Sequence, residues 1–205
     1  MSKTTLSMPN EPRRPAWFGG EGASFRWQGV IVGVATLVGL VLRFYRLGAA
    51  PLSSQEIYTW DFAHQTVPFI VGRLSHIETN PPLYYLMMKL VMTIGETEFL
   101  LRLPSLIAGT LAIPLVYILG RLGGAPRSGV IGAGLVSLSA VAITYSREAR
   151  AYALVQDACL LAAIGAVIVI NHYTVKGNNG SRPARREILG WALFTLTSSV
   201  GFYLH

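Results

Sequence analysis

Three groups of polar residues interrupt the apolar sequence, and they hold side chains that could bind an anion or move a proton. Residues 146–154 carry Arg147, Glu148 and Arg150 between two apolar runs that are each long enough to cross a bilayer. The other two groups are residues 55–56 and 76–85. Charge at membrane depth is expensive and is usually kept for a site. If the three groups face the same side of a membrane, they describe one pocket.

The arginines suit a phosphate. Arg147 and Arg150 are one helical turn apart, and a planar guanidinium matches a phosphate better than an ammonium does. Asp157 follows Arg150 by nearly two turns, so a continuous helix would put both on almost the same face. Alternatively, Glu148, Arg150 and Asp157 merely neutralise one another at a helix end. Arg102, at another membrane edge, is a weaker lipid-phosphate candidate, because its side chain could simply extend to the interface.

The acids of the first polar segment suggest proton transfer. Glu56 could act as general base toward an acceptor hydroxyl. It could also complete a capping box with Ser53, and the two roles are compatible. Asp61 and His64 resemble solvated residues on a helix face. The histidines and the single cysteine show no metal-ligand spacing, so we expect no metal site.

The elements that position these residues must be membrane helices. The chain is 52% hydrophobic and 13% charged, which is too little polar surface for a soluble globule of 205 residues. We predict an all-α, polytopic membrane protein with about five spans. The uncharged runs that predict them are residues 27–42, 103–120, 128–146, 158–175 and 188–204.

The distribution of charge predicts the orientation. With a cytoplasmic N-terminus, the inner segments hold ten of the 17 basic residues and three acids, which accounts for the whole formal charge of +7. Residues 1–26 would be a disordered cytoplasmic tail. The first external loop would span about 43–100, with residues 82–94 as a short helix in the interface. The basic charge reflects topology, and we expect no nucleic-acid partner.

The polar groups also form an ordered series of motifs. These are Leu42-Arg43, residues 52–59, residues 80–85 (Asn-Pro-Pro-Leu-Tyr-Tyr), residues 98–105 and residues 146–154. In this order the sequence resembles polytopic glycosyltransferases of the protein mannosyltransferase type, family 39 and its bacterial Rgt-like relatives. These have the GT-C architecture. The resemblance covers about residues 35–205, so we expect residues 27–205 to be the N-terminal part of such a domain.

The resemblance implies inverting transfer of a sugar from a polyprenyl-phosphate carrier, without a cofactor, at the periplasmic face of a bacterial inner membrane. The acceptor would be a hydroxyl of a glycan, lipid or protein. The family places an Asp-Glu pair in the first external loop, with the Asp as base, and the aligned pair here is Gln55-Glu56. Glutamine cannot take the proton. Either Glu56 or Asp61 substitutes, or this copy is slow or inactive.

The resemblance also assigns binding residues. Asn80 begins the family's Pro-Pro helix, and Arg150 lies in its arginine motif, where the carrier phosphate or the sugar is expected. Asp157 is similar in place to a second acid of the lipid A aminoarabinose transferases. Because such enzymes have more spans than this chain, we expect a fragment whose missing helices complete the lipid groove. The alternative is a non-catalytic membrane module that binds carrier lipid or acts as a scaffold, which Gln55 would favour.

Overall fold

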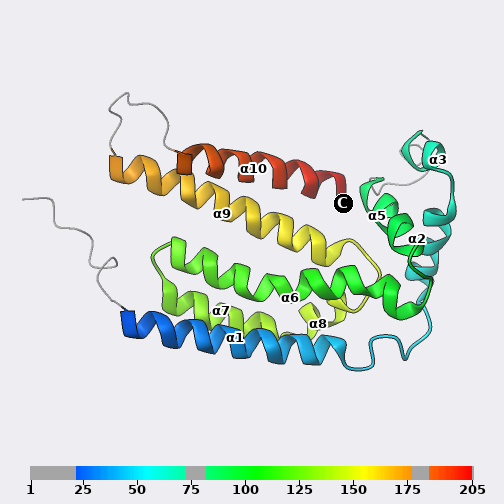
Figure 1. Cartoon of the computed structure of the whole chain (residues 1–205), viewed down its shortest axis with the longest axis horizontal. Coiled ribbons are helices and arrows are strands. Elements are labelled where there is room, and N and C mark those ends of the chain that lie inside the picture. The colour runs from blue at the N-terminus through cyan, green and yellow to red at the C-terminus, as the bar shows by residue number, and fades with distance from the viewer. Residues whose placement is uncertain (1–21, 73–81, 177–184, 205) are drawn as a thin grey trace, which may run out of the picture.

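The computed structural model describes residues 22–72, 82–176 and 185–204, and every regular element among them is a helix (Figure 1). This confirms the predicted all-α class. The helices are α1 (Gly22–Phe44), α2 (Ser54–His64), α3 (Val67–Gly72), α5 (Leu83–Met92), α6 (Glu98–Leu122), α7 (Pro126–Leu138), α8 (Ala140–Ser146), α9 (Tyr152–Lys176) and α10 (Arg185–Leu204).

Four of these helices, α1, α6, α9 and α10, are long and apolar enough to cross a membrane. Helices α7 and α8 together form a fifth candidate that bends by 61°. The prediction of about five spans is therefore confirmed for the part of the chain that the structure describes. The five run side by side along the length of the molecule (Figure 1).

The third predicted span differs from the sequence interpretation because it is broken. Ser139 has an extended backbone (φ −63°, ψ 118°), and its hydroxyl accepts a hydrogen bond from the N–H of Ala142 at 3.3 Å. A serine that caps a new helix start in this way offers the backbone an alternative to continuing the first helix. The uncharged run 128–146 thus forms two helices.

Helix α6 is the centre of the bundle, since it packs against α1, α7, α8 and α9. Its contact with α7 depends on glycine: a Cβ added at Gly120 would lie only 2.5 Å from the Cα of Gly129. The absence of side chains there lets two backbones approach closely, as is common between membrane helices. At its other end α6 begins at a Thr97 cap, whose hydroxyl accepts from the N–H of Leu100.

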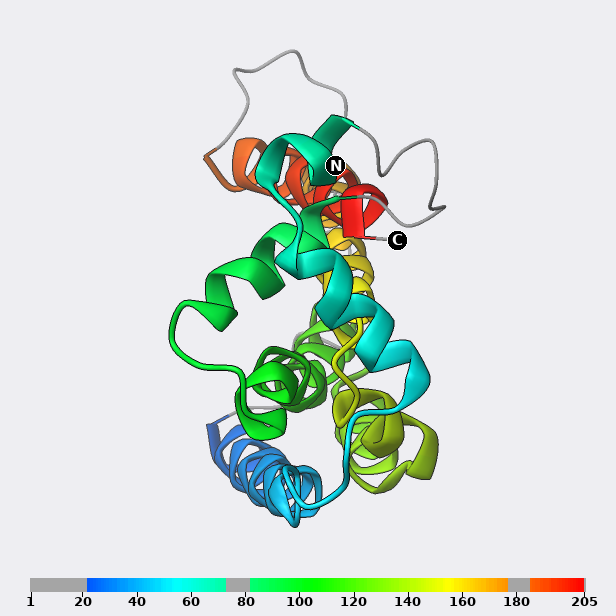
Figure 2. The same ribbon diagram turned by 90° about the vertical axis from the view of Figure 1, so that its right-hand side faces the viewer.

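The short helices α2, α3 and α5 gather at one end of the bundle, which we call the short-helix end (Figures 1 and 2). Helix α5 has ten residues, too few to cross a bilayer, as expected. Its Tyr84, Tyr85 and Met88 are buried, whereas Leu90, and Ile94 just after the helix, are 68% and 77% exposed. The place of this helix in the interface stays a prediction.

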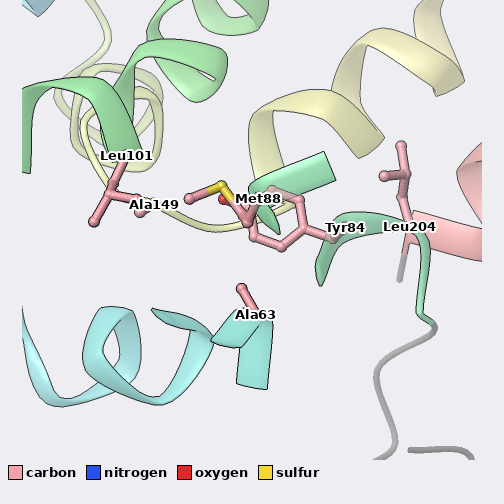
Figure 3. Close-up of a cluster of buried hydrophobic side chains, with 6 residues drawn as sticks. All are labelled: Ala63, Tyr84, Met88, Leu101, Ala149 and Leu204. Atoms are coloured by element: carbon pink, nitrogen blue, oxygen red, sulfur yellow. The ribbon is translucent and has the colours of Figure 1, made fainter. Parts of the chain in front are cut away.

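One apolar core joins the short-helix end to the bundle (Figure 3). It unites residues from α2, α5, α6, the loop 147–151 and the end of α10, namely Ala63, Tyr84, Met88, Leu101, Ala149 and Leu204.

The predicted tail 1–26 falls mostly outside the described residues, although α1 already begins at Gly22. Domain boundaries and orientation stay predictions.

Candidate functional site

Helix α2 positions the Gln55-Glu56 pair through the predicted capping box. The Ser53 hydroxyl accepts a hydrogen bond from the N–H of Glu56 at 3.3 Å, and the N–H of Ser53 donates to Glu56 Oε2 at 2.9 Å. These two bonds confirm the capping box that the Ser-x-x-Glu pattern predicted. Because Gln55 and Glu56 are adjacent on a helix, their side chains point in different directions: Glu56 is 2% exposed, whereas Gln55 lies on the surface.

Both oxygens of Glu56 are occupied by protein donors. Arg102 of α6 donates from Nε to Oε1 and from Nη2 to Oε2, each at 2.8 Å, in a bidentate pair. The N–H of Ala149 donates to Oε1 at 2.9 Å. With the bond from Ser53, the carboxylate accepts four hydrogen bonds. Glu56 therefore ties α2, α6 and the loop 147–151 together.

Arg102 is equally saturated. Besides Glu56, its guanidinium donates to the carbonyls of Leu47, Ala50 and Pro51 at 2.8–3.1 Å, and the residue is 5% exposed. These bonds order the segment between α1 and α2. Because all of these donors bind protein acceptors, they are not free for a lipid phosphate in this structure, and the role of Arg102 as a lipid-phosphate ligand stays a prediction.

The surroundings of Glu56 also set its acidity. Burial alone raises the pKa of a carboxyl group, but here the hydrogen bonds from Arg102, Ser53 and Ala149, with the Arg102 charge, outweigh it and lower the pKa of Glu56 to about 2. A carboxylate with such a low pKa and four donors is a poor proton acceptor at neutral pH.

The lowered pKa predicts an acid-sensitive fold. Since the folded pKa lies below the ordinary value of about 4.3, Glu56 contributes stability that is complete above that value and is lost as the pH falls toward about 2. The full contribution is about 3 kcal/mol, of which about 2 kcal/mol should be lost by pH 2.5. Thermal unfolding in detergent from about pH 6 to pH 2.5 measures it. Glu56→Gln is the control and should flatten this part of the profile; an unchanged slope would contradict the assignment.

The arginine motif lies in a loop. Helix α8 ends at Ser146 and α9 begins at Tyr152, so Arg147 and Arg150 are not on one helix. The continuous helix that would put Arg150 and Asp157 on one face is not formed. Arg147 Nη2 donates to the carbonyl of Arg46 at 3.4 Å. The Arg150 guanidinium lies over the Tyr152 ring, 4.8 Å from its centroid.

The loop 147–151 is fixed from several sides although it has no regular structure. The N–H of Ala149 is held by Glu56, and the carbonyl of Arg150 accepts a bond from the Ser105 hydroxyl of α6 at 3.0 Å. Ala149 is 1% exposed and packs beside Leu101 (Figure 3). The backbone of Arg150 is thus rigidly placed. Its guanidinium has no hydrogen-bond acceptor within the described ranges.

The other candidates are dispersed. Asp61 is exposed on α2, five residues after Glu56. Asp157 lies within the α9 span, where its Oδ1 is buried without a hydrogen-bond partner among the described residues. Asn80 lies outside the described residues. The structure therefore unites Glu56, Arg102 and the backbone of the arginine motif, and it does not join them to Asp61 or Asp157.

Sequence reasoning missed two contributors to this arrangement. The backbone N–H of Ala149 leaves no signal in a sequence. Arg43, which we noted only as part of a motif, is completely buried. The feature of the sequence that could have indicated its burial is Gly39, four residues earlier. A Cβ at Gly39 would lie 3.0 Å from Arg43 Nη1, so the glycine leaves room for the guanidinium. Helical spacing puts both residues on one face.

The comparisons with known proteins give one family. Neither the curated proteins nor the solved structures match this chain. The family model of the dolichyl-phosphate-mannose-protein mannosyltransferases matches residues 79–183, just over half of the chain. The match includes α5 to α9 and the loop 147–151, but not the Gln55-Glu56 pair. Because the model covers more than half of this multi-span chain, we conclude that the chain belongs to the dolichyl-phosphate-mannose-protein mannosyltransferase family.

Proposed function

We propose that the protein takes part in transferring a sugar from a polyprenyl-phosphate carrier to a hydroxyl group of a glycan, lipid or protein, at the external face of a bacterial inner membrane. The family supports the general class, a membrane glycosyltransferase. The observation that carries the proposal for this chain is the contrast among its arginines at the short-helix end.

The guanidinium groups of Arg43 and Arg102 donate hydrogen bonds to protein acceptors, whereas the guanidinium of Arg150 donates none to the described residues. Its backbone is fixed through Ser105, and its neighbour Ala149 is fixed through Glu56. Its guanidinium is half-buried against Tyr152 and keeps its donors for a ligand. A guanidinium on a fixed backbone, with its donors not bound to protein acceptors, suits a phosphate site before the ligand binds. Arg150 is therefore our carrier-phosphate ligand, with Arg147 and Asn80 as further candidates.

Such a site would act on the leaving group. The acceptor oxygen attacks the anomeric carbon from the face opposite the carrier, the bond from that carbon to the phosphate oxygen breaks, and its electron pair goes to the phosphate. The Arg150 guanidinium would stabilise the charge that develops there. The acceptor proton must go to a base, which inverting transfer places on the opposite side of the sugar.

Neither residue of the Gln55-Glu56 pair is suited to act as the general base. Glu56 would not be the base, because its oxygens are already saturated and its pKa is low. Gln55 occupies the exposed position but is not basic. Asp61 is the remaining candidate that we retain from the first polar segment, and Asp157 would serve as a substrate-binding acid. This shortage of a base supports a slow enzyme, or the second candidate, a non-catalytic module that binds carrier lipid.

Binding of undecaprenyl phosphate tests the site without assuming a sugar. We expect Arg150→Gln to weaken binding about 10–100-fold, because one charge-assisted contact to a phosphate is worth about 1.5–3 kcal/mol. Arg150→Lys should fall between, since it keeps the charge but loses the planar fork. Native mass spectrometry of the protein in nanodiscs measures the bound fraction against lipid concentration.

The controls separate phosphate recognition from general lipid binding. Undecaprenol has the same chain without the phosphate, and its binding should not respond to Arg150. Arg127→Gln changes an exposed arginine at the start of α7 and should bind undecaprenyl phosphate normally. Equal binding by the unaltered protein and Arg150→Gln would refute the phosphate site.

A further inference from the structure

Arg43 carries a positive charge in the interior of the helix bundle. It lies in the last turn of α1, a helix whose surface is otherwise mostly exposed, and its own side chain is 0% exposed. An arginine at the end of a span ordinarily extends toward the interface. Arg43 instead turns inward, toward α7 and α8.

All of the acceptors around Arg43 are neutral. Its Nη1 donates to the carbonyls of Gly39 at 3.0 Å and Ser137 at 3.3 Å, and its Nη2 donates to the carbonyl of Val136 at 3.0 Å. Its Nε donates to the Ser146 hydroxyl at 3.2 Å. No carboxylate of the described residues pairs with it. A desolvated charge without a counter-ion is costly, so its position calls for an explanation.

The carbonyls supply that explanation. Val136 and Ser137 belong to the last turn of α7, which ends at Leu138 because the span breaks at Ser139. The final carbonyls of a helix lack helical partners and carry partial negative charge, which a buried cation satisfies and complements. Arg43 thus takes the place of the helical N–H groups that a continuous span would have provided.

Ser146 extends the same contact to the other end of α8. It is the last residue of that helix, it is 2% exposed, and it directly precedes the loop 147–151. It also packs against α6 at Gly109, where an added Cβ would overlap its hydroxyl. One guanidinium therefore contacts both the break before α8 and the residue that ends α8.

We propose that Arg43 is a positioning residue: by holding both ends of α8, it keeps the span bent and sets the place of the loop that carries Arg150. The inference rests on the proposed function for its effect on carrier binding, but not for its effect on the bend.

Spin-label distances test the bend directly. Labels are placed at Val141→Cys of α8 and Ile170→Cys of α9, both exposed, in a Cys159→Ala background. We expect Arg43→Gln to shift or broaden the distance distribution and Arg43→Lys to retain part of the native distance. Arg46→Gln, an exposed arginine in the same segment, should leave the distribution unchanged.

Binding of undecaprenyl phosphate to the same variants tests the consequence. We expect Arg43→Gln to bind about tenfold more weakly, since small displacements of a binding group have large effects. Ser146→Ala removes the acceptor of the Arg43 Nε bond and the hydroxyl's own bond to the carbonyl of Ala142, and it adds no bulk. It should give smaller changes of the same kind, and it serves as the test variant if Arg43→Gln does not fold.

The outcomes are separable. Unchanged distances in both Arg43→Gln and Ser146→Ala overturn the inference, as does a changed distance with unchanged binding. If the unaltered protein does not bind the lipid, the proposed function fails, and the distances alone then decide whether Arg43 holds the bend.

Discussion

Replacing Gln55 with aspartate is expected to raise sugar transfer by about 10²–10⁴-fold, the usual contribution of a general base. The position suits the change, because Gln55 is exposed in the first turn of α2, where an acid is favoured by the helix dipole. The neighbouring Glu56 is occupied and would not compete for the proton. The measurement is release of polyprenyl phosphate from a panel of polyprenyl-phosphate hexoses, in membranes that contain the protein.

Two variants make this experiment decisive. Gln55→Asn keeps a neutral amide and should give no gain. Asp61→Asn should have little effect if position 55 faces the acceptor, whereas loss of transfer on Asp61→Asn, with no gain from Gln55→Asp, would assign the base to Asp61. If neither acid position affects transfer, the external loop does not supply the base.

Removing the Glu56 carboxylate is expected to cost about 3–5 kcal/mol of stability, because it leaves Arg102 buried without its partner. The two side chains are 2% and 7% exposed, so solvent cannot replace the lost contact. Glu56→Ala should lower the unfolding temperature strongly, and Asp61→Ala, an exposed acid on the same helix, should change stability by no more than about 0.5 kcal/mol.

A double-mutant cycle separates the pair from its surroundings. Glu56→Ala with Arg102→Met should be less destabilising than the sum of the single changes, because the double variant leaves no unpaired charge. Additive effects would show that the two residues act independently. Transfer should fall in Glu56→Ala along with stability, since the loop 147–151 loses the bond to Ala149.

The spans and the capping box at the start of α2 followed from the sequence, but the pairings between segments did not. Uncharged length predicts a membrane helix because the bilayer imposes it, and Ser53 with Glu56 is a local pattern whose partners are three residues apart. Arg102 and Glu56 are 46 residues apart, and no periodicity connects them. From the sequence, the two residues are therefore separate candidates, Glu56 as a base and Arg102 as a lipid-phosphate ligand, whereas the structure shows that they form a buried ion pair.

The break at Ser139 escaped prediction for a related reason. Residues 128–146 are apolar throughout, and hydropathy cannot distinguish one straight span from two short helices. The features that favour the bend are a local capping serine and the distant Arg43, which supplies donors to the end of α7. The residues between α8 and α9 then form the loop 147–151.

The bond between Ala149 and Glu56 also constrains the order of events during synthesis. The two residues are 93 positions apart, so at roughly 5–20 residues per second Ala149 leaves the ribosome about 5–20 seconds after Glu56. During that interval the growing chain has α2 without one of the contacts that secure it. The short-helix end can reach its final form only after α6, α7 and α8 have been made, because Ala149 follows them in the chain.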